Sequence, residues 1–156
     1  MLNALAKLNA PHVHLALAGE GPLREEMEQL AIQLGLAQQV HFLGFRTDIP
    51  ILIKTADAVL LVSQQEGLPR SLMEAMCLET PVIGSNIRGI QDLLEDGCGL
   101  LVEVGNIDAI AQAMAQVVDD SESSTAMAQK AQAKMADYDV KQIIQQYTDI
   151  YNLALT

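Results

Sequence analysis

Two carboxylates, Glu66 and Glu74, flank a predicted helix start and are the residues of this sequence best suited to bind or activate a ligand. The apolar run 58–62 predicts a buried parallel strand, and a short polar loop leads from it into a helix predicted at 70–78, with Pro69 in its first turn. In an open α/β sheet, ligands bind beyond the carboxyl ends of the strands, where the free N–H groups of a helix start suit an anion. The pattern therefore predicts a ligand site at this junction.

Two interpretations of these carboxylates are open from the residues alone. Because residues 72–78 are nearly all apolar, we expect Glu74 to be partly buried and so to need a partner, while Gly67 next to Glu66 lets a ligand approach the backbone closely. The alternative is that Glu66 is an ordinary loop carboxylate near a helix N-terminus and that Glu74 is a solvated helix residue.

The composition is that of one globular domain with an aliphatic core. The chain has 156 residues, half of them hydrophobic, but only three tyrosines, two phenylalanines and no tryptophan. A formal net charge of -11 argues against nucleic acid or an anionic membrane surface as the main partner, and an anionic ligand would need helix N-termini and arginines to overcome it locally. With no visible signal peptide or membrane span and no metal-binding cysteine spacing, we expect a cytoplasmic protein with a buried free thiol at Cys77.

Strands and helices alternate along the chain, which predicts an α/β fold with a doubly wound parallel sheet. Strands are predicted at 12–18, 40–43, 58–62, 81–84 and 100–104, and helices at 2–8, 23–34, 48–54, 70–78, 87–95, 109–118, 123–135 and 140–155. Asn106 or Asp108 is expected to start the helix at 109–118, and 119–124 reads as a polar break. His12 and His14 would share one side of the first strand as a metal pair that lacks a third ligand.

The segment 66–76, Glu-Gly-Leu-Pro-Arg-Ser-Leu-Met-Glu-Ala-Met, followed by Thr-Pro-Val-Ile at 80–83, resembles the two-glutamate signature of retaining glycosyltransferases with the GT-B fold. It is similar to glycosyltransferase family 4, also called glycosyl transferases group 1, whose C-terminal domain carries this signature and binds the nucleotide sugar. Further similar pieces follow in the family's order at 18–23, 42–45, 56–58 and 99–102, so the resemblance covers about residues 2–118. It implies the Rossmann-like C-terminal half of a GT-B fold.

The resemblance implies a role for each residue of the predicted site. Glu74 matches the glutamate that accepts the ribose hydroxyls of the donor, and Glu66 the glutamate that contacts the transferred sugar and steadies positive charge at its anomeric carbon. The other implied substrate-binding residues are Gly19 and Gly21 beside the diphosphate, Phe45 and Arg46 along the base, Gly67 and Leu68 on the sugar hydroxyls, and Pro69 and Arg70 at the helix start. No cofactor and no metal is implied, since the nucleoside diphosphate sugar is a substrate.

The implied reaction is transfer of a sugar from a nucleoside diphosphate sugar to a glycan or lipid-linked acceptor, with retention of configuration, as in polysaccharide biosynthesis. The family's Arg–Lys clamp for the diphosphate and its N-terminal acceptor domain have no counterpart in this sequence, so we expect the chain to be inactive alone. Arg46, Arg70 and Arg88 remain as phosphate contacts or as plain surface charge.

The alternatives are a non-catalytic binding or scaffolding module of a split transferase, and a sugar-nucleotide epimerase of the same fold. The Gly-Glu-Gly loop at 19–21 lacks the third glycine of a dinucleotide fingerprint, which disfavours an NAD enzyme.

Residues 1–120 are expected to form the nucleotide-sugar-binding domain, and helices in 121–156 to pack on it or face the missing N-terminal domain. The family's first central strand also has no counterpart here, which would leave the strands at 12–18 and 58–62 each without one neighbour. We expect that these two strands pair and close the sheet, that the chain self-associates through them, or that a partner chain supplies the strand. Glu79 stands where the family usually has glycine, which is expected to weaken the C-cap of the helix at 70–78.

Overall fold

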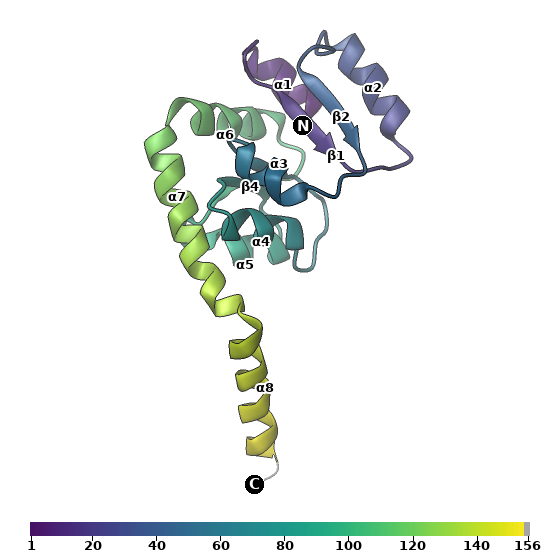
Figure 1. The fold of residues 1–156 in the computed structure, drawn as a ribbon. Coiled ribbons are helices and arrows are strands. Elements are labelled where there is room, and N and C mark those ends of the chain that lie inside the picture. The colour runs from purple at the N-terminus through teal and green to yellow at the C-terminus, as the bar shows by residue number, and fades with distance from the viewer. Residues whose placement is uncertain (155–156) are drawn as a thin grey trace.

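The computed structural model describes residues 1–154, in which strands and helices alternate as predicted (Figure 1). The strands are β1 (Leu15–Ala18), β2 (Val40–Gly44), β3 (Val59–Leu61), β4 (Val82–Ser85) and β5 (Leu100–Val102). The α-helices are α1 (Leu2–Leu8), α2 (Arg24–Gln33), α3 (Ile49–Thr55), α4 (Arg70–Cys77), α5 (Arg88–Leu94), α6 (Ile107–Asp119), α7 (Ser121–Lys134) and α8 (Val140–Ala154), with 3-10 turns η1 (Glu95–Gly97) and η2 (Met135–Tyr138).

The described strands form two separate parallel sheets. In one, β1 pairs with β2, and Leu15 lies opposite Val40; in the other, β4 lies between β3 and β5. The expectation that the strands containing Leu15 and Val59 pair with each other is wrong within residues 1–154, because β1 pairs with β2 alone and β3 with β4 alone. Each of these two strands therefore has one edge without a strand partner.

The unpartnered edge changes how deeply β3 is buried. Every residue of β4, from Val82 to Ser85, is buried, because this strand has a neighbour on both sides. All three residues of β3 are apolar, yet they are only half-buried. The prediction of a parallel strand at 58–62 is confirmed, but its predicted burial is wrong in degree, because a strand flanked on one side leaves its other edge accessible.

Two aliphatic cores hold the elements together. The first joins α1, α6 and residues of both sheets, and α1 packs against α6. Its buried members include Leu2, Leu5, Leu15, Val40, Ile83, Val102, Ile110 and Met114. The second lies between α4, α5 and α7 and includes Leu72, Met76, Ile90, Leu93, Leu94 and Met135. The first core thus connects the two sheets through side chains, although no ladder joins them.

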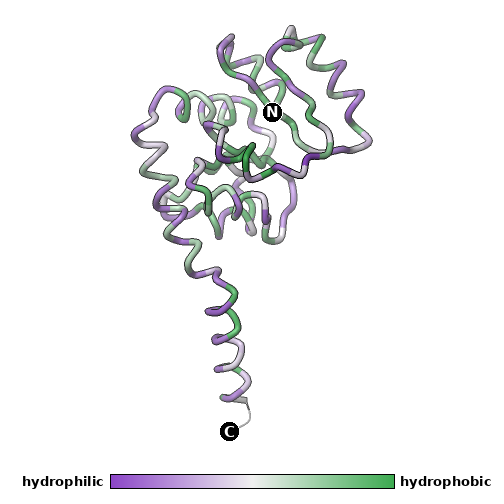
Figure 2. Tube along the Cα trace, in the orientation of Figure 1, coloured by the Kyte–Doolittle hydropathy of each residue, from purple (hydrophilic) through white to green (hydrophobic). Residues whose placement is uncertain are grey.

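The two C-terminal helices differ in their packing. α7 packs against α4 and α6 and buries Ala128 and Ala131, so it belongs to the body of the domain. α8 follows the turn η2 and projects away from the body (Figure 1), with alternating hydrophobic and hydrophilic residues along its length (Figure 2). Among the apolar residues of these two helices and η2, Met135 is buried on the body, Met127 and Ile143 are half-buried, and Ile144 and Tyr147 are exposed. The predicted end of α8 at Leu155 lies outside the described residues.

Several predicted boundaries and environments are corrected. The first strand begins at Leu15 rather than at His12, because residues 11–12 form a turn. The polar break after α6 is a single residue, Asp120, whose side chain accepts a hydrogen bond from the Ser123 N–H at 3.0 Å. Cys77 is exposed, whereas Cys98 is the buried thiol.

Of the two predicted start residues of α6, Asn106 is the N-cap, since its side chain accepts the Ala109 N–H at 3.0 Å, and the helix begins at Ile107 rather than at residue 109. Within the described part of the chain, no helix combines the length and the apolar character needed to cross a membrane.

Candidate functional site

The loop between β3 and α4 places the predicted site residues at the carboxyl end of a parallel strand. Pro69 is the N-cap residue of α4 and is buried, and its carbonyl accepts the Leu72 N–H at 3.2 Å. Gly67 and Leu68 are exposed, and Glu66 is half-buried. No side chain caps the start of α4, so the first N–H groups of this helix are left for water or a ligand.

A glycine that the sequence reasoning missed holds this loop in place. Gly89 lies in the first turn of α5, and a β-carbon at this position would lie 2.6 Å from the carbonyl carbon of Gly67 and 2.9 Å from the carbonyl oxygen of Glu66. No side chain fits there without moving the loop backbone. The residue could have been found only as a glycine inside a predicted helix, which marks a close approach of some other chain segment without telling which.

Glu74 is exposed, which corrects the expectation of partial burial. Residues three and four apart share a helix face, and Glu74 shares its face with Arg70, Ser71 and Cys77, all of which are exposed. The buried residues Leu72, Ala75 and Met76 occupy the opposite side of α4. Its carboxylate is therefore accessible to a ligand that lies along the open face of α4.

The carboxyl end of α4 is firmly anchored. The Glu79 N–H donates to the Met76 carbonyl at 3.1 Å, and the Thr80 N–H donates to the Ala75 carbonyl at 3.0 Å, which is a Schellman motif. Glu79 has φ of 54°, in the left-handed region where glycine is favoured. The Lys54 ammonium also donates to the Leu78 carbonyl at 2.8 Å.

The second group of predicted residues lies at the carboxyl ends of β1 and β2. The Gly19 N–H donates to the Gly44 carbonyl at 2.8 Å, which joins the two loops directly. Gly19 has φ of 133° and needs glycine for that reason, while Gly21 is exposed in the same loop. A cavity of about 330 Å³ adjoins this loop, and its walls include Gly19, Gly21, Arg24 and Phe42.

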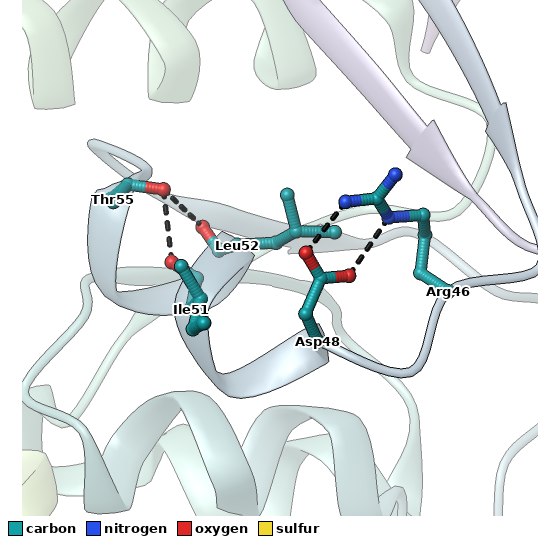
Figure 3. A network of polar contacts seen from close by, with 5 residues as sticks. All are labelled: Arg46, Asp48, Ile51, Leu52 and Thr55. Carbon is teal, nitrogen blue, oxygen red and sulfur yellow. Dashed lines mark hydrogen bonds and ion pairs between the residues drawn. The ribbon is translucent and has the colours of Figure 1, made fainter.

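Phe45 and Arg46 extend from this second group into solvent. Phe45 is 75% exposed, so its ring is free to stack on a flat ligand. Arg46 is bound to Asp48 by two hydrogen bonds, Nε to Oδ1 at 2.8 Å and an Nη to Oδ2 at 2.5 Å (Figure 3). The hydrogen bonds from Arg46 hold the pKa of Asp48 below its ordinary value, and the pKa of Arg46 is raised in turn. Arg46 therefore brings a charge that Asp48 already largely neutralises.

A second cavity lies beside both groups, although none of the predicted site residues lines it. A cavity of about 830 Å³ is lined by Ala18 next to Gly19, by Leu43 next to Gly44, and by Ser71 next to Arg70. The ends of β1, β2 and β3 and the first turn of α4 adjoin this cavity, and Arg70 and Arg88 are exposed. The arrangement offers free backbone N–H groups, two accessible carboxylates and one exposed aromatic ring.

The histidines form a pair other than the predicted one. His14 Nδ1 lies 2.9 Å from His41 Nε2, with the rings stacked at 5.2 Å between centroids, and His12 lies in the turn before β1. Among residues 1–154, no three His, Cys, Asp or Glu side chains gather where they could hold a metal ion.

The chain belongs to the Glycosyl transferases group 1 family, which it matches over residues 1–134. It corresponds to the C-terminal portion of GT-B glycosyltransferases. The predicted family and fold are therefore confirmed.

Two relatives and one solved structure illustrate the likeness. The chain is 31% identical over 131 residues to the lipopolysaccharide core biosynthesis glycosyltransferase LpsE of Rhizobium meliloti, covering 83% of this chain and 38% of LpsE. It is 32% identical over 139 residues to the N-acetyl-alpha-D-glucosaminyl L-malate synthase of Bacillus anthracis, covering 88% and 36%. The crystal structure of Anabaena HepE in complex with UDP-glucose superimposes with a TM-score of 0.88 at 32% identity, covering 97% of this chain and 43% of HepE.

The chain therefore spans less than half the length of these relatives.

Proposed function

We propose that this chain is the donor-binding part of a retaining glycosyltransferase and binds a nucleoside diphosphate sugar at the groove between the β1–β2 loops and α4. The observation that carries the proposal is the likeness to HepE, a protein crystallised with UDP-glucose, over 97% of this chain. The transfer of that sugar to a glycan or lipid-linked acceptor, in the cytoplasm, is part of the same proposal. The free thiols Cys77 and Cys98 agree with a reducing compartment.

The proposed roles follow from the exposed groups on both sides of the groove. Glu74, on the open face of α4, accepts the two ribose hydroxyls, since a carboxylate offers two acceptor oxygens. Glu66 contacts the transferred sugar and stabilises the positive charge that develops at its anomeric carbon. The N–H groups of Gly67 and Leu68 donate to sugar hydroxyls.

The diphosphate and base occupy the remaining positions of the proposed site. The uncapped start of α4 at Pro69 and Arg70 and the loop containing Gly19 and Gly21 border the diphosphate, because helix N-termini and glycine-rich turns accommodate phosphate closely. The exposed ring of Phe45 stacks on the base. Arg46 flanks the base and keeps its pair with Asp48.

The chemical step needs no separate protein base. The bond from the anomeric carbon to the donor phosphate breaks, the departing phosphate oxygen takes the proton of the acceptor hydroxyl, and that hydroxyl oxygen forms the new glycosidic bond on the same face. Glu66 acts on the developing charge, and the helix start at Arg70 acts on the leaving diphosphate. In this proposal the residues of this chain supply the donor side of the reaction.

A non-catalytic module of a split transferase is the second candidate. It is favoured by the edges of β1 and β3 that have no strand partner within the described residues. In that case the donor site would be completed by a second polypeptide.

Calorimetry with UDP, UDP-glucose and a panel of other nucleoside diphosphate sugars tests the proposal. We expect binding by the unmodified chain, and a loss of at least about tenfold in affinity for Glu74→Ala, because a hydrogen bond to a charged group contributes about 1.5–3 kcal/mol. Glu122→Ala removes an exposed carboxylate from the first turn of α7 and should bind as the unmodified chain does. Binding that is equal in all three proteins would place the ribose elsewhere, and no binding of any nucleotide would refute a donor site in this chain alone.

A further inference from the structure

We propose that Arg24, the first residue of α2, is a positioning residue of the donor site, which holds a β-bulge in β2 and so sets the direction in which Phe45 and Arg46 leave the sheet. The inference deepens the proposed function and rests on it where it concerns the base of the donor. Arg24 was not among the residues that the sequence indicated for the site. Its role follows from contacts between α2 and β2.

The ladder between β1 and β2 is irregular just before the predicted site residues. Leu17 pairs with Phe42, but the next residue of β1, Ala18, pairs with Gly44. Between these two pairs β2 therefore has one extra residue, Leu43, which is a β-bulge. A bulge bends its strand and changes the direction of the chain that follows, and bulges are frequent beside active sites.

Arg24 contacts β2 on both sides of this bulge. One Nη group donates a long hydrogen bond to the Phe42 carbonyl at 3.4 Å, and the guanidinium carbon lies 5.9 Å from the centre of the Phe42 ring. A β-carbon at Gly44 would lie 3.5 Å from the other Nη, so the guanidinium also lies against the backbone of Gly44. One planar group thus holds the residue before the bulge and the residue after it.

Arg24 is in turn held by its own helix. Its Nε donates to Oε1 of Glu28, one turn later in α2, at 2.8 Å. Glu25 and Glu26 also lie in the first turn of α2. With three carboxylates this close in the chain, Arg24 adds little net attraction for a phosphate. Its effect on a ligand therefore comes through the backbone that it contacts.

Gly44 connects Arg24 to the part of the loop that faces the ligand. Gly44 has φ of 64°, which turns the chain out of β2, and its carbonyl accepts the Gly19 N–H at 2.8 Å. Phe45 follows directly and is 75% exposed, so few contacts of its own fix the direction of its ring. The position of this ring over a base then depends on the backbone of Gly44, and hence on Arg24.

Calorimetry with UDP tests the link between Arg24 and the base. Arg24→Lys keeps the charge and loses the planar fork, and we expect it to weaken UDP binding by at least about fivefold, because the stacking of Phe45 on the base is lost. In the Phe45→Ala background the same substitution should change the affinity by less than about twofold, since Arg24 acts through that ring. Pyrophosphate, which has no base, should bind the unmodified chain and Arg24→Lys equally.

Gln29→Ala is the matched control, because it changes an exposed, uncharged residue of the same helix and should bind UDP as the unmodified chain does. NMR relaxation without ligand measures the hold on the bulge separately from the donor. We expect the backbone order parameters of Phe45 and Arg46 to fall by at least about 0.1 in Arg24→Lys, while those of Gly67 and Leu68 stay the same.

The other outcomes overturn the proposal. Unchanged order at residues 45–46 in the ligand-free variant would show that Arg24 does not hold this segment, whichever nucleotides bind. Equal weakening of UDP and pyrophosphate would make Arg24 a phosphate contact, and an equal loss with and without the Phe45 ring would break the link to the base. If the unmodified chain bound no nucleotide, the donor site would be refuted, and the ligand-free measurement would still decide the role of Arg24.

Discussion

At the scale of single residues, Glu79 is the clearest case of a side chain in a position that prefers glycine. Its φ of 54° lies in the left-handed region, yet the Schellman hydrogen bonds from Glu79 and Thr80 to the end of α4 are both made. The predicted weakness of the C-cap therefore takes the form of backbone strain in a motif that is otherwise complete. The C-cap holds the end of the helix whose start carries the proposed donor site.

Replacement of Glu79 by glycine should stabilise the domain. The left-handed conformation costs an L-residue about 1–2 kcal/mol, which glycine avoids. Glycine also has more conformational freedom in the unfolded chain, which lowers the stability by about 0.4–1 kcal/mol. We therefore expect the free energy of unfolding to rise by about 0.5–1 kcal/mol. Urea denaturation measures the change. Glu79→Ala is the matched control, because it removes the same carboxylate and keeps a β-carbon. An equal gain in both variants would attribute the effect to lost negative charge instead.

The site residues also show what a sequence can and cannot reveal. The loop with Gly67 and its place after a strand follow from local pattern, and so does the Asn106 cap, because both depend on residues close in the chain. The exposure of Glu74 was misjudged because adjacent apolar residues point to other faces of a helix. Gly89 was missed because its role is set by the backbone of Gly67, which lies in another loop.

At the scale of elements, α7 and α8 have similar lengths and different surroundings. Ala131 of α7 is fully buried against the second core, whereas Ile144, Tyr147 and Tyr151 of α8 are 59%, 60% and 67% exposed. The sequence predicted both helices but did not indicate which of their apolar residues the body of this chain covers. That depends on how many apolar faces the rest of the domain offers.

Three substitutions on α8 should therefore leave the body intact. For the combined variant Ile144→Gln, Tyr147→Gln and Tyr151→Gln we expect an unfolding free energy within about 0.5 kcal/mol of the unmodified chain, and weaker binding of a fluorescent apolar dye. Denaturant titration and dye fluorescence measure these. Ala131→Gln on α7 serves as the contrast and should destabilise by more than about 2 kcal/mol, because it forces a larger polar side chain into a packed core. A large loss in the α8 variant would show that α8 packs on the body in solution.

At the scale of the whole molecule, the net charge of the chain opposes binding of an anionic ligand. The chain carries a net charge of -11, and the proposed donor is an anion. Arg46 is already paired with Asp48, so it adds little net positive charge near the groove. The local attraction must come largely from backbone dipoles, which act at short range, while the repulsion by the other carboxylates acts over longer distances.

Salt should therefore tighten nucleotide binding. Raising the ionic strength from about 0.01 M to about 0.15 M shortens the screening length from about 30 Å to about 8 Å, which weakens the distant repulsion more than the close contacts. We expect the affinity for UDP to rise by roughly twofold, measured by calorimetry, with uridine as the uncharged control. Weaker binding of UDP at the higher salt concentration would show that Arg46, Arg70 or Arg88 dominates the local field.

The gap between β1 and β3 also bears on cooperativity. The ladder of β1 and β2 can open without breaking a hydrogen bond of the other sheet, so the coupling between the two halves is carried by side chains in the first core, mainly where α1 packs on α6. Such a chain has two units, each with its own local stability. A single free energy of unfolding describes both units only if the packing between them makes them unfold together. A ladder across the gap would make the domain one folding unit.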